Sequence, residues 1–501
     1  MAGFENYYMK SESLGAARDK YELTGYPYLN IGSEDFQTNS GTGSEYTSNS
    51  VFGRVIYSYA DRYLFQANVR HDGSSRFAKG YRWGTFPSFS AGWVASEEKF
   101  MKNLKWDWLS FLKLRGSWGM LGNERIGSNY FPYIALMSFG NSLFYMADGS
   151  VVSDKTARPA VLAVEDITWE TTTSTDLGLD VNFLNNRLQF HFDYYWKETK
   201  DMLLNIEIPY FMGYNNPSTN AGKMSTHGYD IEVAWNDQIG DFKYGVNVNF
   251  SDFLSKIDYM NDGEQISGGK IKRAGVLFNE FYGYVCEGIY QTQEEVNNSA
   301  RTSTTVTVGD LKYRDISGPD GVPDGVISPE YDRVPLGNSL PRFQYGGSLN
   351  ASYKGIDFSL AFQGIGKQNS YLSTSMVQPL RDNYGNVPAI LEGKYWSPFN
   401  TTEENLAAKY PRLSNVSKSN NYATSNFWMF NGSYFRLKNI TLGYTLPKSW
   451  TQKAGINRAR FYVSGSDLFC LSNFPSGWDP EMGTSDYPIT TSLVMGIQVN
   501  F

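Results

Sequence analysis

The sequence is poor in cysteine, histidine and charge. Two cysteines, Cys286 and Cys470, stand among 501 residues, which excludes a disulfide scaffold, and no CxxC or Cys/His cluster indicates zinc. Only three histidines, His71, His191 and His227, argue against a histidine-based metal or catalytic centre. Charged residues make up 19%, and 44 Lys plus Arg against 51 Asp plus Glu leave a net charge of −7. This balance argues against nucleic acid as the main partner, because a phosphate-binding face needs a basic excess.

Long apolar runs and helical periodicity are also missing. No stretch of 18 or more apolar residues occurs, which excludes transmembrane helices. Residues 1–13 have no basic stretch followed by an apolar one, so no export signal is visible. Only residues 97–105 and 403–409 predict short helices. The mean hydropathy of −0.42 does not exclude a transmembrane β-barrel, because lipid-facing and lumen-facing residues alternate in its strands.

Aromatic residues, 16% of the chain, are abundant and lie in segments of alternating polarity. In the last ten residues, 492–501, apolar side chains occupy every second position up to Phe501. Residues 173–184 and 187–198 repeat the pattern, and Asn185-Asn186 between them suit the positive φ of a tight hairpin. Most of the predicted strands have 9–14 residues, enough to cross a bilayer at a tilt. We predict thirteen principal strands, at 51–59, 62–71, 84–95, 110–119, 173–184, 187–198, 226–237, 241–254, 343–354, 355–366, 432–445, 458–468 and 491–501.

The connections between these strands alternate between long and short. Residues 120–172, 199–225, 255–342, 367–431 and 469–490 form long connections, whereas those at 60–61, 185–186, 238–240 and 354–355 are tight. Outer-membrane barrels have short periplasmic turns and long extracellular loops. We therefore predict an all-β, antiparallel transmembrane β-barrel over 51–501, with residues 1–50 as an extracellular loop or partial strand. The 255–342 connection is long enough to contain further strands, such as one at 281–291.

Seven ordered segments resemble the SusC/RagA-like TonB-dependent outer-membrane transporters of Bacteroidota. They are RHDGSSRFAKGYRWGTFPSFSAGWVASEEKFM (70–101), FLKLRGSWGMLGNERIG (111–127), ITWETTTSTDLGLDVNFLNNRLQFHFDYYWKETKDMLL (167–204), NAGKMSTHGYDIEV (220–233), PRFQYGGSLNASYKGIDFSLAFQG (341–364), GSYFRLKNITLGYTLP (432–447) and WDPEMGTSDYP (478–488). The resemblance implies the outer membrane of a Gram-negative bacterium and a 22-stranded barrel around an N-terminal plug that follows a TonB box. This chain would supply about the last thirteen strands and lacks the plug and the TonB box.

The resemblance also implies function and partners. It implies uptake of bulky nutrients such as oligosaccharides or peptides, with a SusD-like surface lipoprotein outside and the TonB complex acting through the missing N-terminal region. Phe501 at the end of an alternating strand resembles the signal that the barrel-assembly machinery recognises. An open sheet would leave two unpaired edges in lipid, so we expect an incomplete chain or one completed by a second polypeptide.

Catalysis is not expected, because no G-x-S-x-G, phosphate-binding or dinucleotide motif follows a strand. No cofactor is required for transport through such a wall. The alternative function is that of a secreted or surface β-rich glycan-binding or adhesive protein without transport activity. Such a protein would have shorter strands and loops of similar size at both ends.

Two sets of residues are candidates for contact with a transported solute. Flat rings in the long loops suit stacking on sugars or peptide side chains, although they also suit packing between loops or an interfacial aromatic belt. These rings belong to Tyr395, Trp396, Phe427, Trp428, Trp478 and Tyr487. Polar residues predicted to face the lumen either shape a solute path or simply line a wet interior; they are Arg70, Lys113, Arg115, Asp180, Asp193, Asp230 and Glu232.

A third candidate site is the segment 310–333, DLKYRDISGPDGVPDGVISPEYDR. Calcium prefers clustered carboxylate and carbonyl oxygens around a glycine bend, and this segment offers Asp315, Ser317, Asp320, Asp324 and Asp332. Ser317 stands where many members of the family have Asn, and Pro319 makes the spacing one residue longer. The alternative is a turn cluster rich in Asp, Gly and Pro.

Overall fold

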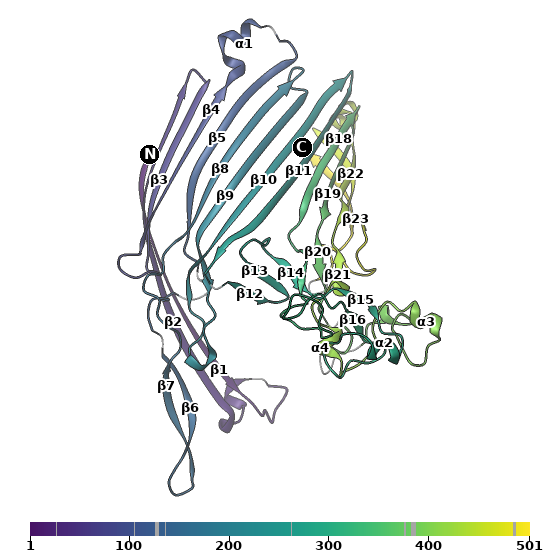
Figure 1. The fold of residues 1–501 in the computed structure, drawn as a ribbon. Coiled ribbons are helices and arrows are strands. Elements are labelled where there is room, and N and C mark those ends of the chain that lie inside the picture. The colour runs from purple at the N-terminus through teal and green to yellow at the C-terminus, as the bar shows by residue number, and fades with distance from the viewer. Residues whose placement is uncertain are drawn as a thin grey trace.

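The body of the chain is one antiparallel sheet of fourteen strands (Figure 1). The computed structural model describes all residues except 27, 105, 126–129, 136, 262, 375–376, 382–386 and 484–486, so parts of the segments quoted at 111–127 and 478–488 lie outside it. In spatial order the strands are β1 (Ala2–Arg18), β2 (Gln37–Tyr59), β3 (Tyr63–Ser74), β4 (Trp83–Val94), β5 (Leu109–Asn123), β8 (Glu170–Phe183), β9 (Leu188–Asn205), β10 (Ser218–Ile239), β11 (Phe242–Met260), β18 (Arg342–Tyr353), β19 (Ile356–Lys367), β22 (Tyr434–Thr445), β23 (Arg458–Ser472) and β24 (Ser492–Asn500).

All thirteen predicted strands are present in the predicted order. The structure adds β1, which lies in the segment assigned to a loop or partial strand and pairs with β2 from Ala2 opposite Gly53 to Arg18 opposite Gln37. Its sequence, AGFENYYMKSESLGAAR, lacks the period-two pattern by which the other strands are recognisable. Pairing with β2 therefore holds this strand in place without a consistent apolar face of its own.

Tight turns join most strand pairs at one end of the sheet, here called the short-turn end. The connections 95–108 and 446–457 at this end are longer and contain the short helices Lys99–Asn103 and Lys448–Thr451. Leu184, Asn185 and Asn186 have φ values of 53°, 58° and 63° between β8 and β9, as the Asn-Asn sequence predicted. Lys354 and Gly355 turn β18 into β19 with φ values of 44° and 90°. The long connections all leave from the opposite end, so the predicted sorting of the connections is confirmed (Figure 1).

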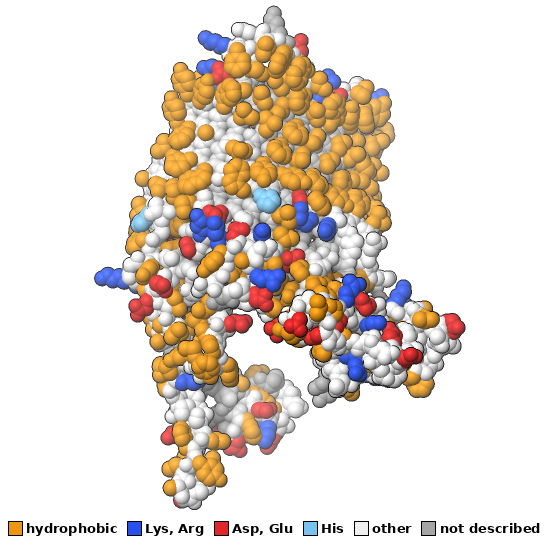
Figure 2. All heavy atoms as spheres, in the orientation of Figure 1, with side chains coloured by type: hydrophobic (Ala, Val, Ile, Leu, Met, Phe, Trp, Pro, Cys, Tyr) orange, Lys and Arg blue, Asp and Glu red, His pale blue; other side chains and the backbone are white. Residues whose placement is uncertain are grey.

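The two faces of the sheet differ in polarity. Along β24, Leu493, Met495 and Ile497 are 65%, 73% and 64% exposed, so large apolar side chains meet the surroundings instead of a protein core. In Figure 2 the outward face of the strands is a broad apolar belt. Charged side chains gather at the short-turn rim and on the other side of the belt. Such a belt matches the lipid-facing surface of an outer-membrane barrel.

The long connections contain further secondary structure. The strands are the hairpin β6 (Met137–Tyr145) and β7 (Val151–Pro159), the sheet of β12 (Glu264–Ser267), β13 (Lys270–Arg273), β14 (Glu280–Gly283) and β17 (Val334–Asn338), the pair β15 (Cys286–Ile289) and β16 (Leu311–Tyr313), and the pair β20 (Asn369–Tyr371) and β21 (Met429–Asn431). Strands β14 and β15 confirm the extra strand predicted near 281–291. We call the described residues of 261–341 and 368–433 the loop module.

Helices are short and lie outside the sheet. They are α1 (Lys99–Asn103), α2 (Gln293–Asn297), α3 (Thr402–Leu406), α4 (Lys418–Asn421) and α5 (Lys448–Thr451), with 3-10 turns at Leu29–Ile31, Glu34–Phe36, Ala95–Glu97, Tyr210–Met212, Ala389–Leu391, Asn426–Trp428 and Gln452–Ala454. Helices α1 and α3 confirm the two predicted ones. No helix within the described ranges is long and apolar enough to span a membrane.

Candidate functional site

A cluster of charges lies on the inner face of strands β5, β8 and β9. Arg115 Nη2 donates to Asp193 Oδ2 at 2.6 Å, and its Nε lies 3.3 Å from Asp180 Oδ1. Gly178 of β8 stands directly opposite Arg115, and a Cβ there would lie 2.5 Å from Arg115 Cζ and 2.6 Å from Asp193 Oδ1. Glycine at this position therefore lets the guanidinium cross β8 to reach a carboxylate on β9.

Acidic groups outnumber basic ones around Arg115. Asp176 lies 3.7 Å from the guanidinium, and Asp180 is also 3.7 Å from Lys113 Nζ. Asp230 of β10 stands directly opposite Asp193, so two carboxylates are cross-strand neighbours. Within the described part of the chain, the buried Oδ1 of Asp193 has no hydrogen-bond partner. The inner wall at this point is therefore a network of ion pairs, in which His191 Nδ1 also lies 3.0 Å from Asp180 Oδ1.

The predicted wall residues divide into groups. Lys113, Arg115, Asp180 and Asp193 come together as described, while Glu232 accepts a hydrogen bond from Asn247 at 2.7 Å on neighbouring strands. Arg70 lies elsewhere, where it pairs with Asp72 at 2.6 Å and with Glu5 of β1 at 2.8 Å. The Arg70–Glu5 pair ties β1 to the wall, a contact that sequence reasoning could not anticipate without β1.

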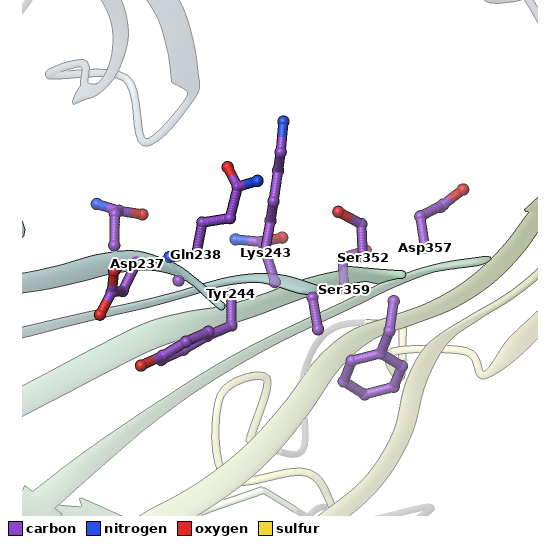
Figure 3. Close-up of a pocket in the computed structure, with 12 residues that line it drawn as sticks. Asp237, Gln238, Lys243, Tyr244, Ser352, Asp357 and Ser359 are labelled. Atoms are coloured by element: carbon purple, nitrogen blue, oxygen red, sulfur yellow. Dashed lines mark hydrogen bonds between the residues drawn. The ribbon is translucent and has the colours of Figure 1, made fainter. Parts of the chain in front are cut away.

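A hollow of about 670 Å³ opens at the short-turn end between strands β10, β11, β18 and β19. Figure 3 shows Gln238, Lys243, Ser352 and Asp357 pointing to one side of these strands and Tyr244 to the other. Arg460 Nε donates to Asp357 Oδ1 at 2.9 Å and so joins β23 to this corner of the wall. Amide, hydroxyl and charged groups of this kind line a wet passage rather than a protein core.

The aromatic residues predicted to bind a ligand have different environments. Trp428 is fully buried with Leu372, Val377 and Phe474, and its indole donates to the Asn421 carbonyl at 2.7 Å. The prediction of ligand contact is therefore wrong for Trp428, because its ring has no exposed face and packs the loop core. Phe427 packs against it edge to face, with ring centroids 4.8 Å apart.

The other predicted rings range from buried to open. Trp396 is 9% exposed and packs against Gly309, where a Cβ would clash with Trp396 Cε3. Tyr395 and Trp478 are half-buried, and Trp478 packs against the Trp428 core. Tyr487, at 80% exposure, is the most accessible ring of the set. Ligand contact through these side chains stays a prediction.

A buried ion pair joins the two halves of the loop module. Asp310 has no exposed surface, and its Oδ1 accepts from Arg412 Nε at 2.7 Å and from Asn421 Nδ2 at 3.0 Å. Its Oδ2 accepts from Ser417 Oγ at 2.9 Å and from the Thr307 backbone N–H at 2.9 Å. Sequence reasoning missed this network because its members lie about a hundred residues apart and form no local motif.

The segment predicted to bind calcium is a hydrogen-bonded turn cluster. Asp332 is fully buried and accepts from the backbone N–H groups of Ile316 and Ser328, both at 2.7 Å. Asp315 Oδ2 accepts from Gly325 N at 2.7 Å, and Asp324 Oδ1 accepts from Val326 N at 2.9 Å. No group of three or more His, Cys, Asp or Glu side chains in the described residues is arranged to hold a metal ion. One oxygen in the segment is still available to a cation: Asp315 Oδ1 is buried and has no hydrogen-bond partner in the described structure.

Two other quoted segments are joined by a buried arginine. Arg436 of β22 is 3% exposed, and its Nη2 donates to both Asp479 carboxylate oxygens at 2.7 and 2.6 Å. The FRLKN and WDPEMG sequences therefore hold the β23–β24 connection against the wall. Phe501 follows β24 and is 85% exposed, and its role as an assembly signal stays a prediction.

The family profile described as "TonB dependent receptor-like, beta-barrel" matches residues 4–464. TonB-dependent receptor P3 of Formosa agariphila is 30% identical over 99% of this chain and 52% of its own length. TonB-dependent receptor SusC of Bacteroides thetaiotaomicron is 30% identical over 90% of this chain and 43% of its own length.

The solved structure of the RagAB peptide transporter matches the whole chain. It aligns over 100% of this chain and 53% of its own with a TM-score of 0.79, and 24% of aligned residues are identical, which indicates a shared fold. The chain spans about half the length of the curated relatives it matches.

Proposed function

This chain belongs to the TonB dependent receptor-like, beta-barrel family, and we propose that it forms the wall of a transporter that imports bulky nutrients such as oligosaccharides or peptides. Proteins of this family lie in the outer membrane of Gram-negative bacteria, and so does this chain. The observation that carries the proposal is the inverted polarity of the sheet, with an apolar outer belt and a charged inner wall around Arg115.

The proposed partners follow from the relatives. The likeness to SusC and to the RagAB peptide transporter supports a SusD-like surface lipoprotein over the long loops and energy supplied by the TonB complex. Assembly into the membrane would use the barrel-assembly machinery, with Phe501 as part of the signal. The proposal is transport and not catalysis.

The alternative of a secreted adhesive or glycan-binding protein fits less well. The strands of the main sheet run from 9 residues in β24 to 23 in β2, whereas strands of globular proteins commonly have about 5–6. Every long connection leaves from the same end of the sheet, and a binding module has no physical need for that arrangement.

Uptake measurements in the native bacterium test the proposal. We expect deletion of the full-length gene to abolish import of one labelled class, oligosaccharides or peptides, and depletion of TonB to have the same effect. Complementation with the full-length gene should restore import, and the protein should be recovered in the outer-membrane fraction. Unchanged import of both classes together with recovery outside the outer membrane would refute the transporter function.

A further inference from the structure

The short-turn end carries exposed aromatic rings at two places, one before β5 and one between β22 and β23. Trp106 and Trp108 in the connection from α1 to β5 are 43% and 49% exposed, and Trp450 of α5 is 63% exposed. Trp106 stacks on Trp108 with centroids 5.4 Å apart, and Trp108 stacks on Phe183 at 5.8 Å. Phe183 is the last residue of β8, in the alternating row that includes the exposed Leu177. Trp106 and Trp108 therefore continue the apolar belt of β8 up to the rim of the sheet.

Basic residues gather beside these rings. The connections at the short-turn end contain eight Lys and Arg against five Asp and Glu, in a chain whose net charge is −7. These connections are residues 60–62, 95–108, 184–187, 240–241, 354–355 and 446–457. Lys99 of α1 and Lys448 and Lys453 around α5 are exposed. Figure 2 shows basic side chains at this rim, directly beyond the apolar belt. The short-turn end is thus cationic while the rest of the chain is acidic.

We propose that this rim binds the anionic phospholipid headgroups of the periplasmic leaflet, with Lys99, Lys448 and Lys453 at the phosphates and Trp106, Trp108 and Trp450 at the headgroup level. Tryptophan prefers the membrane interface because its ring is apolar while its N–H needs a polar partner. Lysine near an anionic surface gains attraction that salt screens. A soluble periplasmic protein is the less suitable partner, because Trp106 and Trp108 are continuous with the lipid-facing belt.

Lipid selectivity measured on the full-length protein tests this inference. The protein is placed in vesicles of dibrominated phosphatidylglycerol or dibrominated phosphatidylcholine, and quenching of tryptophan fluorescence gives the relative binding of the two lipids. We expect a preference for phosphatidylglycerol that disappears at high salt. The triple variant Lys99→Glu, Lys448→Glu, Lys453→Glu should reduce that preference, by up to roughly fivefold for each lysine.

A matched variant makes the same charge change at the other end of the molecule. Lys155→Glu, Lys394→Glu and Lys409→Glu alter three exposed lysines of the long connections and should leave the lipid preference unchanged. Trp106→Phe with Trp450→Phe should lower the quenched fraction for both lipids, whereas Trp396→Phe should not. The inference would be overturned by an equal phosphatidylglycerol preference in the wild type and the rim triple variant, or by equal losses of that preference in the two triple variants. The first of these results would favour a protein as the partner of the rim.

Discussion

The wall and the loop module both contain an ion pair between arginine and aspartate, but the two sites are built in opposite ways. Arg115 is bonded by Asp180 and Asp193, which come from the next two strands of a regular ladder, and its side chain is 32% exposed. Asp310 is fully buried, and the residues that bond it come from Thr307 on one side and from 412–421 on the other. We therefore expect the wall to tolerate the loss of one charge and the loop module to depend on single contacts.

The largest effect is expected from removing the centre of the loop core. Trp428→Ala leaves a cavity among Leu372, Val377 and Phe474 and should destabilise the module by about 3–5 kcal/mol. Cys286 reports the opening, because burial raises the pKa of its thiol to about 11, so near pH 8 the thiol is protonated and unreactive. Unfolding returns this pKa toward its ordinary value, and labelling by a maleimide accelerates.

The labelling experiment uses a background in which every other cysteine of the full-length protein, Cys470 included, is replaced by serine, so that one thiol reports. Tyr487→Ala is the matched control, since an 80% exposed ring leaves no cavity when it is removed. Labelling that stays slow in Trp428→Ala would mean that the module does not depend on this ring for its stability.

Arg412→Ala should have the next largest effect. It leaves Asp310 buried without its cation, and breaking a buried pair from one side costs about 3–5 kcal/mol. Because the Arg412 side chain is 25% exposed, we expect a loss at the lower end of that range. Arg412→Lys should retain only part of the stability lost in Arg412→Ala, because Arg412 Nε and Nη2 bond different oxygens of Asp310 and lysine has a single ammonium group. Proteolysis of the 368–433 connection and Cys286 labelling measure the loss.

A double-mutant cycle separates charge burial from packing. Asp310→Asn removes the buried charge, although it also turns one accepting oxygen into an N–H donor. Because no buried charge is then left unpaired, Arg412→Ala should cost much less in that background. Additive losses in the double variant would show that the ion pair does not couple the two connections.

The contrast between wall and module also explains what the sequence could predict. Period-two alternation placed all thirteen predicted strands, and Asn185-Asn186 marked a tight turn, because these features are local. Strand β1 was not predicted, because its pairing with β2 and not an alternating pattern of its own defines it. Asp310 and Arg412 escaped because the contact spans 102 residues, and Trp428 was misassigned because a large ring in a long loop has the same sequence signal whether it is buried or exposed.

Arg115→Ala should affect the wall less than Arg412→Ala affects the module. The backbone ladder of β5, β8 and β9 stays intact, and a partly exposed ion pair contributes about 0.2–1 kcal/mol. Heat-dependent migration of the full-length protein on gels measures the stability of the barrel. Arg115→Lys serves as the control that keeps the charge. A loss as large as that of Arg412→Ala would show that the wall also depends on single contacts.

The smallest effect is expected from calcium at the 310–333 segment. If Asp315 Oδ1, buried without a partner in the described structure, binds the ion, calcium should raise the melting temperature of the module by a few degrees relative to chelator. Asp315→Asn should then abolish the difference between calcium and chelator.

Asp332→Asn distinguishes calcium binding from the stability of the turn itself. The Asp332 carboxylate already accepts from the backbone N–H groups of Ile316, Ser317 and Ser328, so its replacement should lower the melting temperature equally with calcium and with chelator. A calcium response that survives Asp315→Asn would place the ion elsewhere. No response in the wild type would leave the segment as a turn cluster, stabilised, like the rest of the module, by its own buried carboxylates.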